Sequence, residues 1–222
     1  KLLWKENTLT GITVGTISNN KVPVTGISGN GNAVVAITDA SDNILWSYHI
    51  WVPEIDPTAG LLTYAIPSAS NGSGSTYEVM PIALGAMNTV AAGATAVVDS
   101  YGLYYQWGRK DPFIGPNTYQ GSEGSGASMY SGSGSRVYLK MSESSAETGT
   151  MEYAIRNPLV FITGVADTDN DWLWSGRSDQ LWSADDNVAD KSVNDPCPYG
   201  WRVAPSAAFD NLLVKNTPEA GD

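Results

Sequence analysis

An acidic run in the second half of the chain places three carboxylates at alternate positions: Asp167, Asp169 and Asp171. Calcium takes several oxygen ligands, and an alternating acidic loop can wrap them around one ion. The run lacks both the glycine and the final glutamate of an EF-hand loop. It therefore predicts either weak calcium binding or a solvated turn in which Asp and Asn side chains bond their own backbone. We expect no other cofactor.

Aromatic residues follow the acidic run and could offer flat faces to sugar rings. Trp172, Trp174 and Trp182 are accompanied by Arg177 and Asp179, whose polar groups could bond sugar hydroxyls. The tyrosines and the tryptophan between residues 104 and 107 could extend the same surface. The alternative is that these aromatics fill the core of a helix-poor domain, since buried tryptophan is common.

The chain has few histidine and cysteine side chains, which can act as catalytic nucleophiles, bases or metal ligands. The chain has one histidine, His49, and one cysteine, Cys197, which excludes multi-histidine and cysteine-rich zinc sites. No Gly-x-Ser-x-Gly motif supplies a nucleophile for His49, so a packed, hydrogen-bonded histidine is the expectation. The separation of carboxylate pairs in space is invisible in a sequence, which leaves acid–base glycoside hydrolysis open. We expect a protein that is not an enzyme.

Length and charge restrict the partners. The 222 residues suit one large domain or two small ones, and 42% hydrophobic residues can bury a core. A formal net charge of −11 argues against nucleic acid, because phosphate binding needs a basic patch. No apolar run approaches the roughly 20 residues of a membrane span, so we expect no transmembrane segment.

The elements that must position these residues are mostly strands. β-branched residues alternate from Gly11 to Val24 around Asn19-Asn20, which predicts a hairpin. A second hairpin is predicted from the apolar runs 33–37 and 44–52, joined by an Asp/Ser/Asn turn. Because both faces of Ile44–Val52 carry large apolar groups, we expect it to be a central strand. Residues 121–135, rich in Gly and Ser, predict a surface loop.

Two short helices are predicted. Thr150 can cap a helix that Pro158 must stop. Ser206 can cap a second helix whose apolar stripe is Phe209, Leu212 and Leu213.

Three segments, in this order, carry a resemblance to a known family. They are 31–36 with 44–51, the aromatic segment 101–113, and 194–203, which contains a Cys-Pro-x-Gly-Trp-Arg-Val motif. Between about Gly31 and Leu213 the chain resembles fimbrillin-like cell-surface proteins of Bacteroidetes. Their C-terminal region is similar to the Fibrobacter major paralogous domain, which is thought to be related to C-type-lectin-like folds. The family pattern usually has Pro-Thr after Arg-Val, where this chain has Ala204-Pro205.

The resemblance and the residue patterns together predict a β-rich α+β fold. Residues 1–56 are expected to form a small antiparallel sheet or the end of a sandwich. Residues 57–222 are expected to form a loop-rich, C-type-lectin-like region with short helices, incomplete at its C-terminus. The resemblance further suggests that the native chain is longer and that Cys197 pairs with a cysteine beyond Asp222. A buried free thiol is the alternative.

The function that the resemblance implies is a non-catalytic adhesion module, extracellular and located on the outer cell surface or in a fimbria. Its expected partners are a host or microbial surface glycan or protein, and other fimbrial subunits. The alternative is a lectin-like carbohydrate-binding module that captures glycans, with or without calcium. The resemblance supplies no catalytic residues.

Overall fold

The computed structural model describes residues 1–65, 76–89, 98–115, 129–178, 180–183 and 191–209. Its largest element is a five-stranded sheet, in which the strand order is β5-β4-β1-β8-β9. All four neighbouring pairs are antiparallel. The strands are β1 (Leu2–Glu6), β4 (Gly31–Thr38), β5 (Ile44–Val52), β8 (Met129–Tyr130) and β9 (Arg136–Val137). The sheet therefore takes strands from both sides of the division expected at residue 56.

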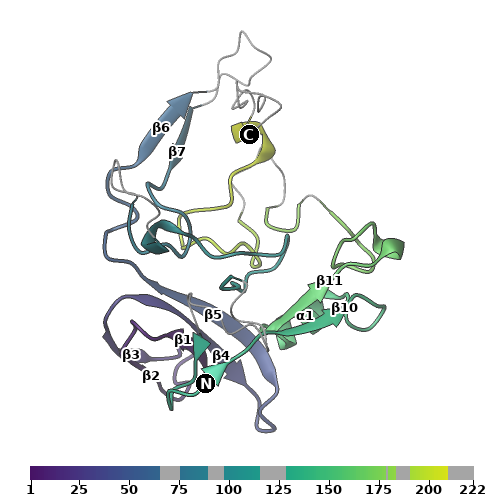
Figure 1. Ribbon diagram of the computed structural model, residues 1–222, viewed down its shortest axis with the longest axis horizontal. Helices are drawn as coiled ribbons and strands as arrows, with labels where there is room; N and C mark the ends of the chain where they lie inside the picture. The colour runs from purple at the N-terminus through teal and green to yellow at the C-terminus, as the bar shows by residue number, and fades with distance from the viewer. Residues whose placement is uncertain (66–75, 90–97, 116–128, 179, 184–190, 210–222) are drawn as a thin grey trace, which may run out of the picture.

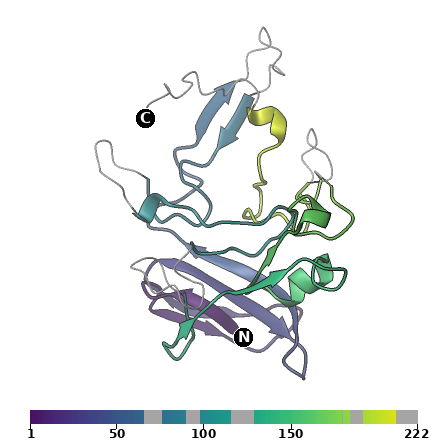
Figure 2. The same ribbon diagram turned by 45° about the vertical axis from the view of Figure 1, so that its right-hand side comes forward.

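The remaining strands form three two-stranded sheets, arranged around the large sheet as Figures 1 and 2 show. They pair β2 (Gly11–Val14) with β3 (Val24–Ser28), β6 (Leu62–Ala65) with β7 (Thr76–Val79), and β10 (Lys140–Glu143) with β11 (Val160–Thr163). Among the strands of the described residues, only the β10–β11 pair is parallel. Helix within the described residues comprises α1 (Met151–Arg156) and the short 3-10 turns Val98–Ser100, Ala166–Thr168 and Ser206–Phe209. The predicted β-rich class with antiparallel sheets and little helix is confirmed.

Turn chemistry explains both predicted hairpins. Asn19 and Asn20 adopt left-handed backbone angles, with φ of 50° and 59°, and Ser18 bridges Lys21 across the turn. Consecutive positive φ values are what a tight two-residue hairpin turn requires, and asparagine tolerates them. In the second hairpin the Asp39 carboxylate accepts hydrogen bonds from the backbone of Ser41 and Asn43, which closes the turn between β4 and β5.

The expectation that Ile44–Val52 is a central strand is wrong. β5 pairs with β4 along its whole length, from Gly31 opposite Val52 to Thr38 opposite Ile44, but it lies at the edge of the sheet. Apolar residues on both faces of a strand indicate that other parts of the protein pack above and below it. They do not indicate whether a second strand bonds to its backbone. Here the chain around Lys110 and Asp111 packs beside β5 and bonds Ser47.

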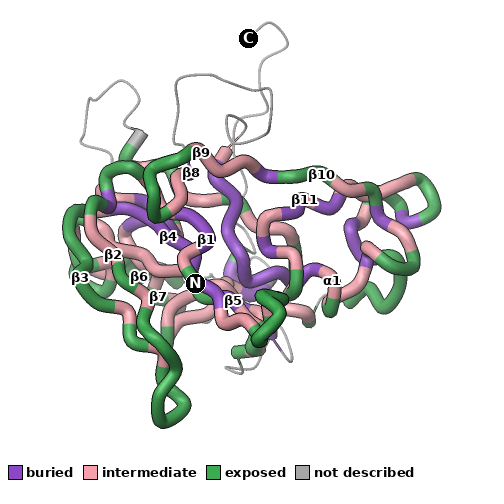
Figure 3. Tube along the Cα trace, turned by 90° about the horizontal axis from the view of Figure 1, so that it is seen from below, coloured by how far each residue is buried: buried purple, intermediate pink, exposed green. Residues whose placement is uncertain are grey.

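The main core lies on the face of the sheet that carries Val34 and Ala36 of β4. The buried side chains that join them come from several distant segments and are Leu3, Trp4, Phe113, Ile114, Met129 and Leu139. Figure 3 shows the buried β4 beside the more exposed β2–β3 hairpin. Met129 belongs to the predicted 121–135 surface loop. That part of the prediction is wrong, because residues 129–137 form β8, β9 and the turn between them.

The predicted helix after Thr150 is confirmed as α1, which connects β10 to β11. The Thr150 hydroxyl accepts a hydrogen bond from the Tyr153 backbone N–H at 3.1 Å, and the helix ends before Pro158. A second buried cluster packs Ala154 of α1 against Val160, Ile162, Trp172 and Leu173. The second predicted helix begins at Ser206 as a 3-10 turn, and Leu212 and Leu213 lie outside the described residues.

Candidate functional site

Two tryptophans that lie far apart in the sequence form a partly exposed aromatic pair. The ring centroids of Trp107 and Trp182 are 4.6 Å apart and the ring planes are tilted by 54°. The Trp107 indole N–H donates to the Ser178 carbonyl at 3.0 Å, and the Trp182 indole N–H donates to the Arg109 carbonyl at 3.1 Å. Each ring is thus anchored to the chain segment of the other. Trp107 is 42% exposed and Trp182 is partly exposed.

Gly108 makes this pairing possible. Its φ is +82°, and a Cβ atom at this position would lie 2.5 Å from the side chain of Leu181. Only glycine combines a left-handed backbone with so close an approach. The sequence expectation included Trp182 but treated Trp107 only as an upstream neighbour, since nothing in the spacing of the two residues indicates that their rings meet.

The other tryptophans of the predicted site have different environments. Trp172 is only 4% exposed, and its indole N–H donates to the Trp107 carbonyl at 2.7 Å. It therefore belongs to the core and cannot present a face to a sugar. Trp174 is 37% exposed. Asp179, the remaining acidic residue of the predicted site, lies outside the described residues.

The acidic run forms a tight turn. Ala166–Thr168 is a 3-10 turn, and Asp169 and Asn170 follow with φ of 49° and 64°. The buried Thr168 hydroxyl accepts from the Val165 N–H at 3.1 Å and bonds the Asp171 carbonyl at 2.6 Å. The predicted turn is therefore present, but the hydroxyl of Thr168 closes it, and of the Asp and Asn side chains only Asp171 bonds nearby backbone.

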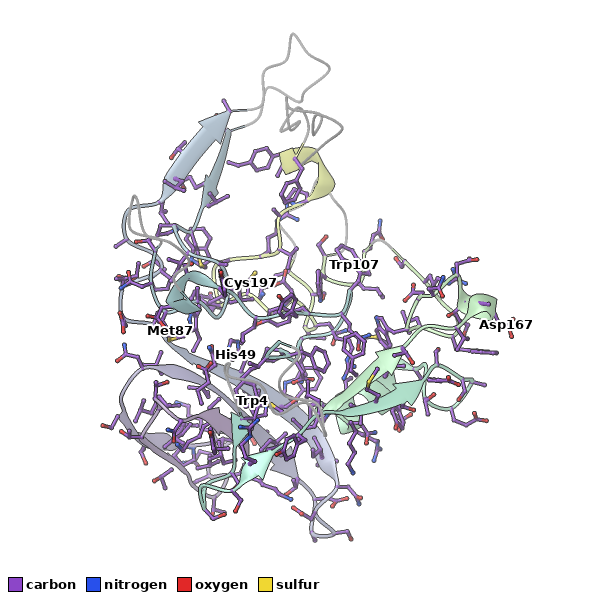
Figure 4. All side chains as sticks on the ribbon, in the orientation of Figure 1. Trp4, His49, Met87, Trp107, Asp167 and Cys197 are labelled. Atoms are coloured by element: carbon purple, nitrogen blue, oxygen red, sulfur yellow. The ribbon has the colours of Figure 1, made fainter. Side chains whose placement is uncertain are left out.

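The carboxylates of this turn do not converge on an ion. Asp169 pairs with Arg177 at 2.7 Å on the surface, and Asp171 accepts from the Leu173 N–H at 3.1 Å. Across the described part of the chain, no three His, Cys, Asp or Glu residues are grouped so that they could hold a metal ion. Asp167 lies at the outer edge of the molecule (Figure 4). The structure thus does not assemble Asp167, Asp169 and Asp171 as a calcium site.

The acidic turn is nevertheless connected to the aromatic pair. Arg177 bonds Asp169, and the next residue, Ser178, accepts the hydrogen bond from Trp107. The side chains of Arg177 and Asp169 are both exposed. The residue that anchors the Trp107 ring is therefore the sequence neighbour of an arginine in a surface ion pair, and we call Trp107, Trp182, Arg177 and Asp169 the tryptophan site.

His49 takes part in a chain of side-chain hydrogen bonds. Its Nε2 lies 2.8 Å from the Asn32 Oδ1, and its Nδ1 lies 3.3 Å from the Tyr105 hydroxyl. The Asn32 amide nitrogen donates to the Glu6 carboxylate at 3.0 Å and to the Gly85 carbonyl at 2.8 Å, so its oxygen faces the histidine. His49 therefore donates from Nε2 and accepts at Nδ1, which is the neutral tautomer.

The pKa shifts of His49 and Cys197 both favour the uncharged forms of these side chains. Burial lowers the pKa of His49 to about 3 and raises the pKa of the Cys197 thiol to about 12. A reactive cysteine shows the opposite shift, because a neighbouring cation stabilises its thiolate. Figure 4 places His49 and Cys197 in the middle of the molecule. The packed, hydrogen-bonded histidine expected from the sequence is what the structure contains.

A buried serine, lysine and aspartate form a cluster that the sequence did not reveal. Lys110 Nζ donates to both oxygens of Asp111, at 2.9 and 3.0 Å, and to the Ser47 hydroxyl. Ser47 in turn donates to Asp111 at 2.5 Å. Serine–lysine pairs act as nucleophile and base in some hydrolases. Here all three residues are buried, and the lysine is held by a carboxylate, so the cluster ties β5 to the 109–113 segment.

Arg109 is the second buried cation, and it holds the end of α1. Its guanidinium donates to the carbonyls of Val160 at 2.8 Å and Asn157 at 3.2 Å, and to the Gln106 side chain at 2.7 Å. A cation at the carboxyl end of a helix satisfies carbonyls that have no partner within the helix. Burial lowers the pKa of Arg109 to about 10, which keeps it charged at neutral pH.

Asp195 closes the turn that contains the single cysteine. Its buried carboxylate accepts from the Cys197 N–H and the Val203 N–H, both at 2.8 Å, and pairs with Lys191. Gly200 has a φ of +85°, a left-handed backbone angle that glycine adopts without strain. Cys197 is partly buried and forms no disulfide with the described chain, so its pairing with an outside cysteine stays a prediction.

Comparisons with protein-family models, curated proteins and solved structures found no match to this chain. A search of the described residues for a helix of membrane-spanning length and hydropathy found none.

Proposed function

We propose that the chain is a non-catalytic adhesion module of the outer cell surface or of a fimbria. The observation that carries the proposal is the contrast between its buried and exposed side chains. Lys110 is buried and bonded within the protein, and both ring nitrogens of the partly buried His49 are taken up by Asn32 and Tyr105. The Cys197 thiol is partly buried. Large aromatic side chains are exposed instead, namely Tyr101, Tyr104, Trp107, Trp174, Tyr199 and Phe209. Exposed aromatic residues are typical of binding surfaces.

The resemblance of segments 31–51, 101–113 and 194–203 to fimbrillin-like proteins supports the same proposal. It also supplies the finer fold assignment, a C-type-lectin-like arrangement after residue 56. The partner is a glycan or protein on a host or microbial surface, or another fimbrial subunit. The net charge of −11 disfavours nucleic acid as a partner.

Adhesion can be measured directly with protein-coated beads. We expect beads that carry this chain to adhere to epithelial or bacterial cells several-fold more than beads coated with an unrelated protein of similar net charge. The same preparation should not hydrolyse generic glycosides or esters. Equal adhesion of both bead types, or measurable turnover, would contradict the proposal.

Glycan binding is the second candidate, and the tryptophan site specifically favours it. Aromatic faces stack on the apolar C–H groups of sugars, and the exposed Arg177–Asp169 pair offers both a donor and an acceptor for hydroxyls. Because the two ring planes are tilted, Trp107 and Trp182 present their faces to a ligand at different angles. Because the acidic turn does not gather its carboxylates, the proposed binding is independent of calcium.

A glycan array read with and without EDTA tests this candidate. We expect bound glycans to be unaffected by EDTA and to be lost in Trp107→Ala, because truncation removes the exposed ring. Tyr48→Ala is the matched control, since Tyr48 is also exposed but lies on β5. Loss of binding with EDTA, or equal loss in both variants, would rule out this site.

A further inference from the structure

An apolar groove lies between the β2–β3 hairpin and the large sheet. Its volume is about 480 Å³. Ile17, Val22 and Val24 line it from the hairpin, and Val35, Tyr48 and Ile50 line it from β4 and β5. None of the residues that line the groove belongs to the tryptophan site, and the proposed function does not involve the groove.

Strand alternation explains why the sheet side is apolar. Val35 lies opposite Tyr48, and Ala33 lies opposite Ile50, so these residues share one face of the sheet. Val34 and Ala36 point the other way and belong to the main core. The sheet therefore has an apolar surface on each side, and the groove lies on the side opposite to the core.

The hairpin forms the other wall without closing the groove. β2 and β3 pair only with each other, so no strand hydrogen bonds draw them onto β4 or β5. Ile17 remains 50% exposed and Tyr48 remains 49% exposed. Figure 3 shows the hairpin as an exposed arm beside the buried β4 strand. Apolar side chains left open in a concave site indicate a place for an apolar ligand.

The chemistry of the lining specifies the ligand. No Asp, Glu, Lys or Arg lines the groove, and the polar residues in its lining are Asn20, Tyr48 and His49. His49 lies opposite Val34, so its side chain belongs to the other face of the sheet, where its ring nitrogens bond Asn32 and Tyr105. A charged ligand would lose its hydration without gaining a counter-charge. The volume lies within the range of about 300–1,000 Å³ that is typical of small-molecule sites.

We propose that this groove binds one small, uncharged, apolar molecule. The lack of charge in the lining excludes acidic lipids, nucleotides and peptides with charged side chains as preferred ligands. The molecule is held by contact with the aliphatic side chains of both walls.

Fluorescence titration with N-phenyl-1-naphthylamine, an uncharged apolar probe, tests the proposal on the intact chain. We expect saturable binding of one probe per chain. Octanol should displace the probe at concentrations at least tenfold below those needed for octanoate, which has the same chain length but carries a charge.

Two matched substitutions locate the binding. Ile17→Asp should weaken probe binding at least tenfold, because it places a charge in the lining. Ile27→Asp should change it less than twofold, since Ile27 is 42% exposed on the same hairpin but does not line the groove. Tyr48→Ser gives a second variant should Ile17→Asp fail to fold, and it should also weaken binding. Trp107→Ala should leave probe binding intact, which separates this site from the tryptophan site.

Several results would overturn the proposal. Absence of saturable binding, equal displacement by octanol and octanoate, or an equal loss in Ile17→Asp and Ile27→Asp would each do so. Sedimentation that shows a dimer which Ile17→Asp converts to a monomer would identify the groove as a self-association surface instead.

Discussion

At the scale of single residues, the molecule separates groups that could react from groups that can bind. Lys110, Asp111 and Ser47 bond one another inside the protein, and the buried Asn32 bonds the partly buried His49 and Glu6. A charged or polar group that is buried in this way costs free energy unless every partner remains in place. We therefore expect these residues to determine stability, whereas the exposed aromatic residues determine binding.

The Lys110–Asp111 pair gives the strongest stability prediction. Asp111→Ala should lower the free energy of unfolding by about 3–5 kcal/mol, because it leaves a buried ammonium without its carboxylate. Asp42→Ala is the control, since Asp42 pairs with Lys1 on the surface and should cost no more than about 1 kcal/mol. Urea denaturation of both variants measures the difference. Similar costs for the two would show that the buried cluster contributes little.

His49 gives a pH dependence whose sign follows from its lowered pKa. The ordinary pKa of 6.5 applies in the unfolded chain, and about 3 applies in the folded one. Between these pH values the unfolded state binds a proton that the folded state does not. The contribution of His49 to the free energy of unfolding is therefore fully present above pH 6.5 and is lost as the pH falls towards 3. The loss should approach about 1.4 kcal/mol per pH unit at most.

Comparison with His49→Gln isolates this contribution. The free energy of unfolding of the native chain should fall more steeply between pH 6.5 and pH 4.5 than that of the variant, as measured by urea denaturation at each pH. Glu6 shifts in the opposite sense, because burial raises its pKa, and it is present in both proteins. Parallel curves for the two proteins would contradict the lowered pKa of His49.

At the scale of elements, the sequence predicted the turns and helix starts that depend on neighbouring side chains. The Asn19-Asn20 turn and the start of α1 at Thr150 were predictable because each depends on side chains within a few residues. The edge position of β5 was not, because strand order depends on partners elsewhere in the chain. Nor did the Gly/Ser-rich stretch indicate that its end would supply Met129 to the core.

The N-cap of α1 is directly testable. Thr150→Ala should lower the free energy of unfolding by about 1 kcal/mol, because the Tyr153 N–H loses its acceptor. Thr150→Ser keeps a hydroxyl and should retain most of the stability. Equal losses in the two variants would show that the hydrogen bond is not what matters at this position.

At the scale of the whole molecule, contacts between distant segments assemble both the core and the candidate site. Residues 2–6 pair with residues 129–130, and Arg109 joins α1 to β11. Trp107 meets Trp182 across 75 positions of sequence, which the composition and spacing of the chain could not reveal. The sequence did indicate the kinds of residue involved, namely aromatics beside an acidic turn. Which tryptophans are exposed follows only from the packing that buries Trp172.

We propose that this chain acts by binding through exposed aromatic residues and not by chemistry at its bonded polar groups. Bead adhesion by Trp107→Ala and Tyr105→Phe tests it most directly, because Tyr105→Phe removes only the hydroxyl that faces His49 Nδ1. The account predicts that Trp107→Ala reduces adhesion at least tenfold, while Tyr105→Phe retains it within twofold. Adhesion that survives Trp107→Ala but is abolished in a folded Tyr105→Phe protein would contradict it.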